Sequence, residues 1–227
     1  MSQVDQWRAW LAPPVQLFFV PSLDGWPKSR ESELTPEHVD TFRAWRPEFR
    51  TRQRLWLDEP TFFSLSDRRQ SQLRRTRPTV WPSEATDNVV RAFVESENEA
   101  SEHARVTTWS LPRAKQLAGT FAARSGPNCF GAVMGAAGVA GAEHEQMLQE
   151  PFEEWLHAHA RRGGNDVMVW RETATQLPFH AAITLGDGWV FEKPSQCWWT
   201  HWQVVSEATV KRVTRMRGLR LERWRLR

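Results

Sequence analysis

The spacing of apolar positions predicts a mainly helical N-terminal half. Residues 15–20 (VQLFFV), which end at a proline, are the one stretch there that is typical of a strand. A Thr-Pro pair at residues 35–36, followed by apolar residues at helical spacing, predicts a helix that a later proline kinks or splits. We expect further helices over residues 66–76, which are rich in arginine, and 83–97, where apolar residues face inward.

The middle of the chain predicts more helices. One begins at residues 110–112 by the same capping pattern and ends before the Gly-Pro pair at 126–127. Residues 129–137 are small and apolar throughout, which is typical of a helix buried on all sides. Two more helices are expected, over 143–149 and 151–162, and the charges of the second suit the helix dipole at both ends.

The pattern then changes to the two-residue period of strands. Three strands are predicted, at residues 166–170, 179–185 and 189–193. Gly-Asp-Gly at 186–188 closes a hairpin between the last two, and residues 204–205 and 209–213 are candidates for one or two further strands. Helices followed by an antiparallel sheet predict an α+β fold.

The composition is that of a globular protein. Apolar residues make up 40% and charged residues 25%, and no run approaches the roughly 18 apolar residues that a membrane span needs. The first eight residues lack the basic start and apolar stretch of a secretory signal. These features predict a soluble cytoplasmic protein that does not bind a membrane.

Cysteine and histidine spacing offers no metal site. The two cysteines, Cys129 and Cys197, are too few for a disulfide framework and form no CxxC pair. His157 and His159 lie two apart on a predicted helix, so they point in different directions and cannot share a metal ion. We therefore expect no metal and no cofactor.

Charge and aromatic content bear on partners. The net charge is +3, and arginine greatly outnumbers lysine, with clusters at residues 43–77 and 211–227. Such patches favour a solvated face or an acidic protein partner over a nucleic acid. The chain has fourteen tryptophans and no tyrosine, and we expect most of the tryptophans to pack in the core, with a platform for a ligand as the alternative.

A cysteine stands at a predicted helix start. The sequence GPNCFG at residues 126–131 puts Cys129 in a first turn, where unpaired N–H groups and the helix dipole favour thiolate over thiol. The same N–H groups can form half of an oxyanion hole, and the glycines let a substrate approach closely. The alternative is a small buried hydrophobic residue beside alanines and glycines.

The predicted hairpin fixes a register. A three-residue loop at 186–188 gives the opposing pairs Leu185–Trp189 and Ala182–Glu192. Alternation then places Ala182 and Glu192 on one face, whereas a loop one residue longer or shorter sends Glu192 to the other face.

His180 shares the face of Glu192 and lies diagonal to it in this register. The carboxylate can accept a hydrogen bond from Nδ1, fix the tautomer and stabilise the imidazolium that forms when His180 takes a thiol proton. The alternative is an unrelated histidine beside a Glu–Lys surface pair.

These residues resemble a known family. Their order is a Cys, then a His on a predicted strand, then a polar residue twelve positions after the His, with an LGDG turn between the last two. This order is similar to that of the NlpC/P60 group of papain-like cysteine hydrolases. The resemblance covers roughly residues 110–195 and implies that Cys129 is the nucleophile, His180 the base and Glu192 its orienting group. It also implies a papain-like α+β core in which the Cys helix packs on an antiparallel sheet.

The chain departs from the family in three ways. It has Asn-Cys-Phe-Gly where the family has Asp-Cys-Ser-Gly, it has no tyrosine, and it lacks the export signal and wall-binding repeats of members that cut peptidoglycan. The resemblance therefore supports the cysteine-hydrolase chemistry more strongly than it supports a cell-wall substrate.

We accordingly expect a helical N-terminal extension over residues 1–105 and an NlpC/P60-like core with a basic C-terminal tail over 106–227. The expected substrate is a peptide or acyl compound, contacted by Asn128, Phe130 and Trp198. Core packing is the alternative role for the aromatic cluster around Trp198. The alternative function is a non-catalytic papain-like module that binds a nucleic acid or protein through its arginines and tryptophans.

Overall fold

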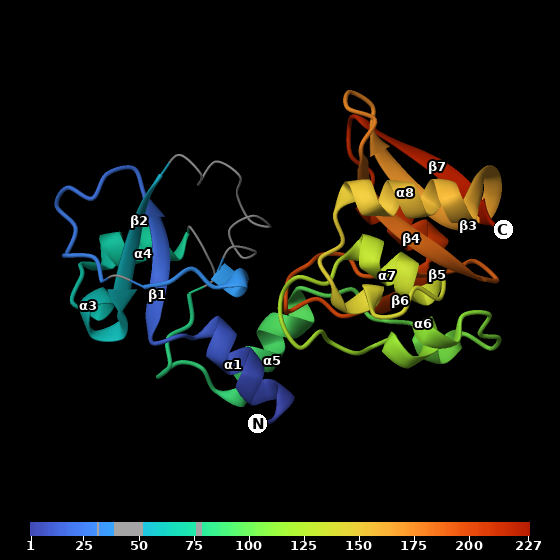
Figure 1. Cartoon of the computed structure of the whole chain (residues 1–227). Helices are drawn as coiled ribbons and strands as arrows, with labels where there is room; N and C mark the ends of the chain where they lie inside the picture. The colour runs from blue at the N-terminus through green and yellow to red at the C-terminus, as the bar shows by residue number, and fades with distance from the viewer. Residues whose placement is uncertain (31, 39–51, 76–78) are drawn as a thin grey trace. The chain divides into compact units, whose positions relative to one another are not determined.

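The chain forms two compact units, Met1–Glu97 and Asn98–Arg227 (Figure 1). The structure is a computed structural model that describes residues 1–30, 32–38, 52–75 and 79–227. Each unit has a hydrophobic core of its own.

The N-terminal unit is built around a two-stranded antiparallel sheet. Its elements are α1 (Gln3–Leu11), β1 (Val15–Val20), β2 (Gln53–Asp58), α3 (Glu59–Phe63), α4 (Asp67–Arg74) and α5 (Asp87–Ser96). Strands β1 and β2 pair along their whole length, from Val15 opposite Asp58 to Val20 opposite Gln53. Phe18, Phe62 and Trp81 are fully buried and their rings contact one another in the core.

Several predicted elements of this unit are confirmed, namely strand β1 and the two helices α4 and α5. The sequence pattern missed α1, β2 and α3. Helix α1 begins with a capping box between Ser2 and Asp5. The helix expected from Thr35 onward shows a helical turn at residues 36–38, and the rest of it lies outside the described residues.

The C-terminal unit is an α+β fold around a five-stranded antiparallel sheet of order β6-β5-β4-β3-β7. Its strands are β3 (Ala160–Glu172), β4 (Pro178–Gly186), β5 (Trp189–Glu192), β6 (Gln203–Ser206) and β7 (Leu219–Leu226). Its helices are η2 (His103–Arg105), α6 (Pro112–Leu117), α7 (Cys129–Ala136), η3 (Ala142–His144), α8 (Gln149–His159) and α9 (Glu207–Val213).

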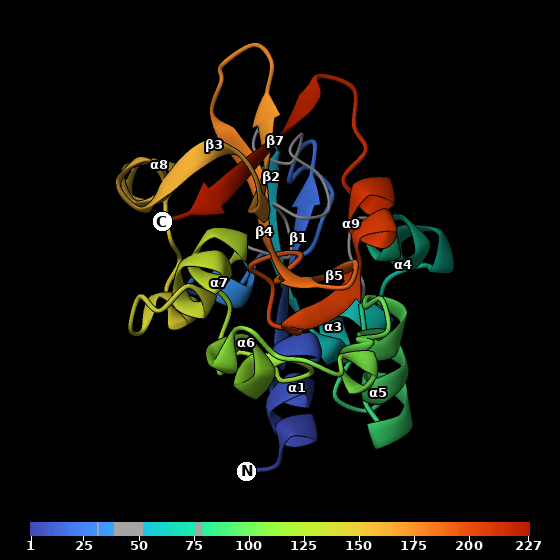
Figure 2. The same ribbon diagram turned by 90° about the vertical axis from the view of Figure 1, so that its right-hand side faces the viewer.

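Helices cover both faces of this sheet. Helices α7 and α8 lie on one side and α9 on the other (Figure 2). On the α7 side, Val133 packs in one cluster with Ile183 and Phe191. On the α9 side, Val210 packs with Val190 and Val205. The sheet is therefore buried on both faces where these helices cover it, which explains the apolar runs at 167–170 in β3 and 181–183 in β4.

Three expectations for helices and strands in this unit are wrong. The helix expected to run from residues 110–112 to the Gly-Pro pair at 126–127 ends at Leu117, as α6. Residues 209–213 belong to α9 rather than to a strand, because Ser206 caps a helix by accepting a hydrogen bond from the Thr209 amide. The helix expected at 143–149 is only the short 3₁₀ turn η3.

The C-terminal tail is a strand. Of the residues 211–227 that the charge pattern marked as a basic tail, 211–213 end α9 and 219–226 form β7, which pairs with β3 from Ala160 opposite Leu226 to Glu172 opposite Leu219. Gly164 lies at this pairing, and a Cβ there would stand 2.2 Å from the Cβ of Arg225. Gly164 therefore permits close strand approach, and α8 ends earlier than expected, at His159.

Within the described residues, no helix is long and apolar enough to cross a membrane.

Replacement of Gly131 by alanine tests how α7 is seated. A Cβ at Gly131 would lie 2.3 Å from the carbonyl oxygen of Ala142 and 3.0 Å from that of Glu145. Helix propensity alone predicts that Gly131→Ala stabilises the protein by about 1 kcal/mol. We expect instead that it lowers the free energy of unfolding in denaturant by about 2 kcal/mol, because backbone oxygens cannot swing aside. A more stable variant would contradict this packing.

Candidate active site

Cys129 is the first residue of α7, and Asn128 sets that position. Asn128 has an extended backbone, and its Oδ1 accepts a hydrogen bond from the Gly131 amide at 3.1 Å. Its Nδ2 donates to the carbonyl oxygen of Met147 at 2.7 Å. The side chain thus caps the helix and ties its start to the segment before α8.

Two backbone donors at this helix start are unused. Among the described residues, the N–H groups of Cys129 and Phe130 have no acceptor, whereas the next N–H is capped by Asn128. All of them point out of the positive end of the helix dipole. A carbonyl oxygen held beside Cys129 can therefore receive hydrogen bonds from the backbone.

His180 on β4 and Glu192 on β5 form a buried pair. His180 Nε2 lies 2.6 Å from Glu192 Oε2. Cys129 and His180 expose 8% and 7% of their surfaces, but Glu192 only 1%. Cys129 and His180 therefore retain some contact with solvent, whereas Glu192 is almost fully buried.

The register that brings this pair together matches the expected one beyond the turn. Ile183 pairs with Phe191, which puts Ala182 opposite Glu192. The expected pairing of Leu185 with Trp189 is wrong, because Gly186 takes that place.

The turn itself explains this difference. It has two residues, Asp187 and Gly188, both with positive φ (51° and 78°), and a bulge at Leu185 supplies the third. The bulge and the two-residue turn together give the strands the same register as the predicted three-residue loop.

The ring nitrogen that binds the carboxylate also differs from the expectation. Glu192 binds Nε2 rather than Nδ1. Cys129 also acts on the pKa of the His180 ring, and with Nε2 bound to Glu192, Nδ1 is the nitrogen left for the thiol.

The charges around His180 favour its protonated form. Burial opposes a charge on the ring, but the hydrogen bond and negative charge of Cys129, together with those of Glu192, outweigh it. The pKa of His180 is raised to about 10. At neutral pH His180 is therefore an imidazolium.

Gln203 on β6 is a fourth member that the sequence pattern did not reveal. It stands opposite Glu192 in the β5–β6 ladder, and its Nε2 donates to Glu192 Oε1 at 2.7 Å. Both carboxylate oxygens are thus bound. A strand at 204–205 was expected, but the β5–β6 connection is too long to act as a tight turn that fixes its register.

The β5–β6 connection is organised around a buried lysine. Lys193 is fully buried, and its Nζ donates to the carbonyl oxygens of Ser195, Cys197 and Thr200 and to Thr200 Oγ1, at 2.7 to 3.2 Å. Four oxygen acceptors around an ammonium group compensate for the loss of its hydration.

This connection is bonded to the segment that leads into Cys129. The Gly126 amide donates to the Gln196 carbonyl oxygen at 2.9 Å, and the Trp202 amide donates to that of Thr120 at 3.0 Å. The loop that follows Glu192 therefore holds the approach to Cys129, so the sheet and the nucleophile's helix are tied together.

The three expected substrate contacts occupy different positions. Asn128 and Phe130 line a surface groove of about 480 Å³. The ring of Phe130 is buried and stacks on Phe152, with ring centroids 4.6 Å apart. Trp198 is buried too, against Trp199, with its amide bonded to Ser125.

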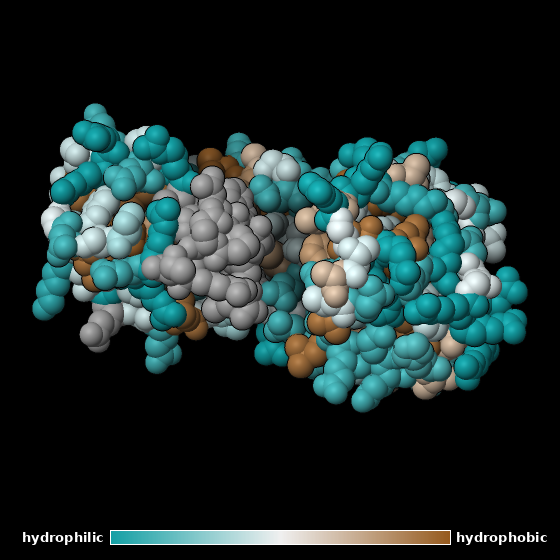
Figure 3. Space-filling model, turned by 90° about the horizontal axis from the view of Figure 1, so that it is seen from above, coloured by the Kyte–Doolittle hydropathy of each residue, from teal (hydrophilic) through white to brown (hydrophobic). Residues whose placement is uncertain are grey.

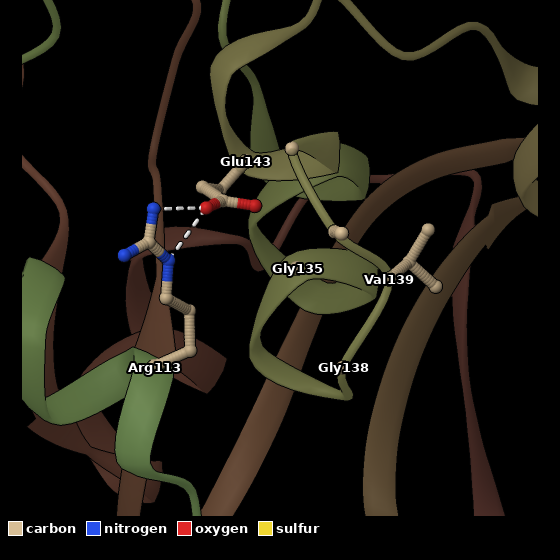
Figure 4. A pocket seen from close by; sticks show the side chains of 7 residues that line it. Arg113, Gly135, Gly138, Val139 and Glu143 are labelled. Atoms are coloured by element: carbon tan, nitrogen blue, oxygen red, sulfur yellow. Dashed lines mark hydrogen bonds and ion pairs between the residues drawn. The ribbon is translucent and has the colours of Figure 1, made fainter.

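The opposite end of α7 is anchored separately. There Arg113 Nε donates to Glu143 Oε1 at 2.5 Å, beside a hollow lined by Gly135 and Gly138 (Figure 4). A Cβ at Gly135 would lie 2.5 Å from Glu143 Oε2, so this glycine makes room for the carboxylate. This pair fixes the C-terminal end of the helix whose first residue is Cys129.

The described residues contain no group of three or more metal-ligating side chains. Comparisons of the chain with family models, curated proteins and solved structures find no match.

The Glu192→Gln variant tests the electrostatics of the site. The neutral amide removes a negative charge that raises the pKa of His180, so we expect that pKa to fall from about 10. NMR titration of ¹⁵N-labelled histidine measures the change, with the exposed Glu95→Gln as control. An unchanged His180 titration would show that Glu192 does not act on the ring.

Proposed function

We propose that the protein is a cysteine-nucleophile hydrolase or acyltransferase that acts on an amide, peptide or ester bond. The observation that carries the proposal is the buried pair of His180 and Glu192, with Nε2 2.6 Å from Oε2, together with the effect of Cys129 on the pKa of His180. A nucleophile, a base and an orienting group linked in this order are the parts that acyl transfer needs.

The first step forms an acyl-enzyme. The Cys129 thiolate attacks the carbonyl carbon, and a C–S bond forms as the C=O π electrons move to oxygen. When the tetrahedral intermediate collapses, the C–N or C–O bond breaks and the leaving group takes a proton from His180. The products are a thioester on Cys129 and a free amine or alcohol.

The second step releases the acyl group. Water, or another acceptor in the case of an acyltransferase, gives its proton to His180 as its oxygen or nitrogen attacks the thioester. The C–S bond then breaks, the acyl product leaves and the thiolate is restored beside the imidazolium.

Backbone amides support both tetrahedral intermediates in this proposal. The unused N–H groups of Cys129 and Phe130 lie at the helix start, where the developing oxyanion would sit. Removal of one such donor in other enzymes costs about 10²–10³ in rate.

The positions of the tryptophans favour a hydrolase over a binding module that uses them as a stacking platform. Trp81, Trp198 and Trp202 are among the largest fully buried side chains. A buried ring cannot stack on the base of a bound nucleic acid.

The NlpC/P60-like, papain-like arrangement inferred from the sequence is part of the proposal. Its support is the α+β fold and the Cys helix packed on the antiparallel sheet. A cell-wall substrate is not part of it.

Alkylation of Cys129 by iodoacetamide tests the proposal. At pH 6 an isolated thiol with the ordinary pKa of about 8.5 is almost wholly protonated and reacts slowly. We expect Cys129 in a Cys197→Ser background to react at least about tenfold faster than in the same background with His180→Ala or His180→Gln. Mass spectrometry of the intact protein gives the rates.

Two features keep this comparison interpretable. His180→Gln retains a hydrogen-bonding side chain toward Glu192, so it guards against loss of the fold in the alanine variant. His157→Ala removes an imidazole that is 61% exposed on α8 and should leave the rate unchanged. Equal rates with and without His180 would overturn the proposed function.

A further inference from the structure

An apolar groove adjoins the nucleophile. It has a volume of about 480 Å³, and its lining includes Asn128 and Phe130, the two neighbours of Cys129 in the chain. Met147 and Leu148 line it from the segment before α8, and Leu177 from the turn before β4. Since Leu177 directly precedes β4, the groove is bounded by the start of the nucleophile's helix and by the loop that leads into the strand of the base.

Three large apolar side chains are exposed in this region. Leu148 is 64% exposed and Leu177 45%, and Phe179, beside His180 on β4, is 44% exposed. Much of the molecular face in Figure 3 is hydrophilic, with apolar residues in small patches. Exposed leucines that line one groove beside a reactive thiol are typical of a binding surface.

The two walls of the groove are held together. Gln149 Nε2 donates to the carbonyl oxygen of Pro178 at 2.7 Å, which fixes Leu148 near Leu177. Asn128 is bonded to Met147 in the same way. The groove is therefore formed before a ligand binds, and little ordering cost remains.

Side-chain amides at the groove suit a peptide. The Nε2 groups of Gln146 and Gln149 are bonded within the protein, whereas their Oε1 atoms have no partner among the residues that the structure describes. Each Oε1 can accept a hydrogen bond from a peptide N–H. A fatty acyl chain has no such donor.

We propose that this groove binds the substrate and that the substrate is a peptide with an apolar side chain close to the bond that Cys129 attacks. Leu148 and Leu177 contact that side chain. The Oε1 atoms of Gln146 and Gln149 accept hydrogen bonds from the N–H groups of the peptide backbone. The inference rests on the proposed function, because the groove is assigned by its position next to Cys129 and His180.

Chloroacetamide probes that alkylate Cys129 test the groove. Chloroacetyl-leucine N-methylamide and chloroacetyl-glycine N-methylamide share one electrophile and one backbone and differ only in the side chain. We expect the leucine probe to react about tenfold faster in the wild type. Leu148→Ser combined with Leu177→Ser should bring this ratio close to one, because both changes remove apolar contacts.

Controls separate the outcomes. Leu23→Ser replaces a leucine that is 40% exposed in the N-terminal unit and should keep the wild-type ratio. Equal rates of the two probes in the wild type would overturn the groove assignment. So would a preference for the leucine probe that is unchanged by the double substitution. A faster reaction of N-hexyl chloroacetamide than of the leucine probe would overturn the choice of a peptide.

A different result, the rate of each probe rather than the ratio of the two rates, tests the proposed function. If His180→Gln leaves the rates of both probes unchanged, the thiol is not activated by His180, whatever their ratio.

Discussion

The C-terminal unit depends on the burial of one carboxylate. Glu192 is 1% exposed, and a charge in that position is tolerated only if both oxygens are bound. His180 binds one oxygen and Gln203 the other, each from a neighbouring strand. Removal of one partner from a buried ion pair costs about 3–5 kcal/mol, so strand register and site geometry are stabilised by the same contacts.

The nucleophile belongs to a different layer, and two sets of contacts hold it against the sheet. Asn128 caps α7, and the Gly131 backbone touches the 142–145 segment closely enough to exclude a Cβ. The connection after Glu192 bonds to residues before Cys129, and buried Lys193 gives that connection its shape. Cys129 and His180 are thus brought together by packing that neither residue's local sequence reveals.

Much of the local structure follows from sequence patterns. The buried helix at Cys129, the β4–β5 hairpin and the side of the sheet that carries Glu192 were predictable, because capping residues and alternation act over a few positions. Even where the turn prediction was wrong at Leu185, the bulge preserved the register of the strands.

What could not be predicted depends on contacts between distant segments. Gln203 reaches Glu192 across a connection too long to act as a tight turn, and the basic C-terminal residues pair with β3 although their charge suggested a solvated tail. The expected choice of Nδ1 for Glu192 was wrong because ring orientation depends on where the helix places Cys129. Alternation alone does not contain that information.

The most direct test of the central claim is whether Cys129 becomes acylated. After incubation with p-nitrophenyl acetate, intact-mass analysis and peptide mapping should find one acetyl group on Cys129 in the wild type, none in Cys129→Ala and much less in His180→Gln. Acetylation that persists in Cys129→Ala, or that is indifferent to His180, would contradict the assignment of this pair as nucleophile and base.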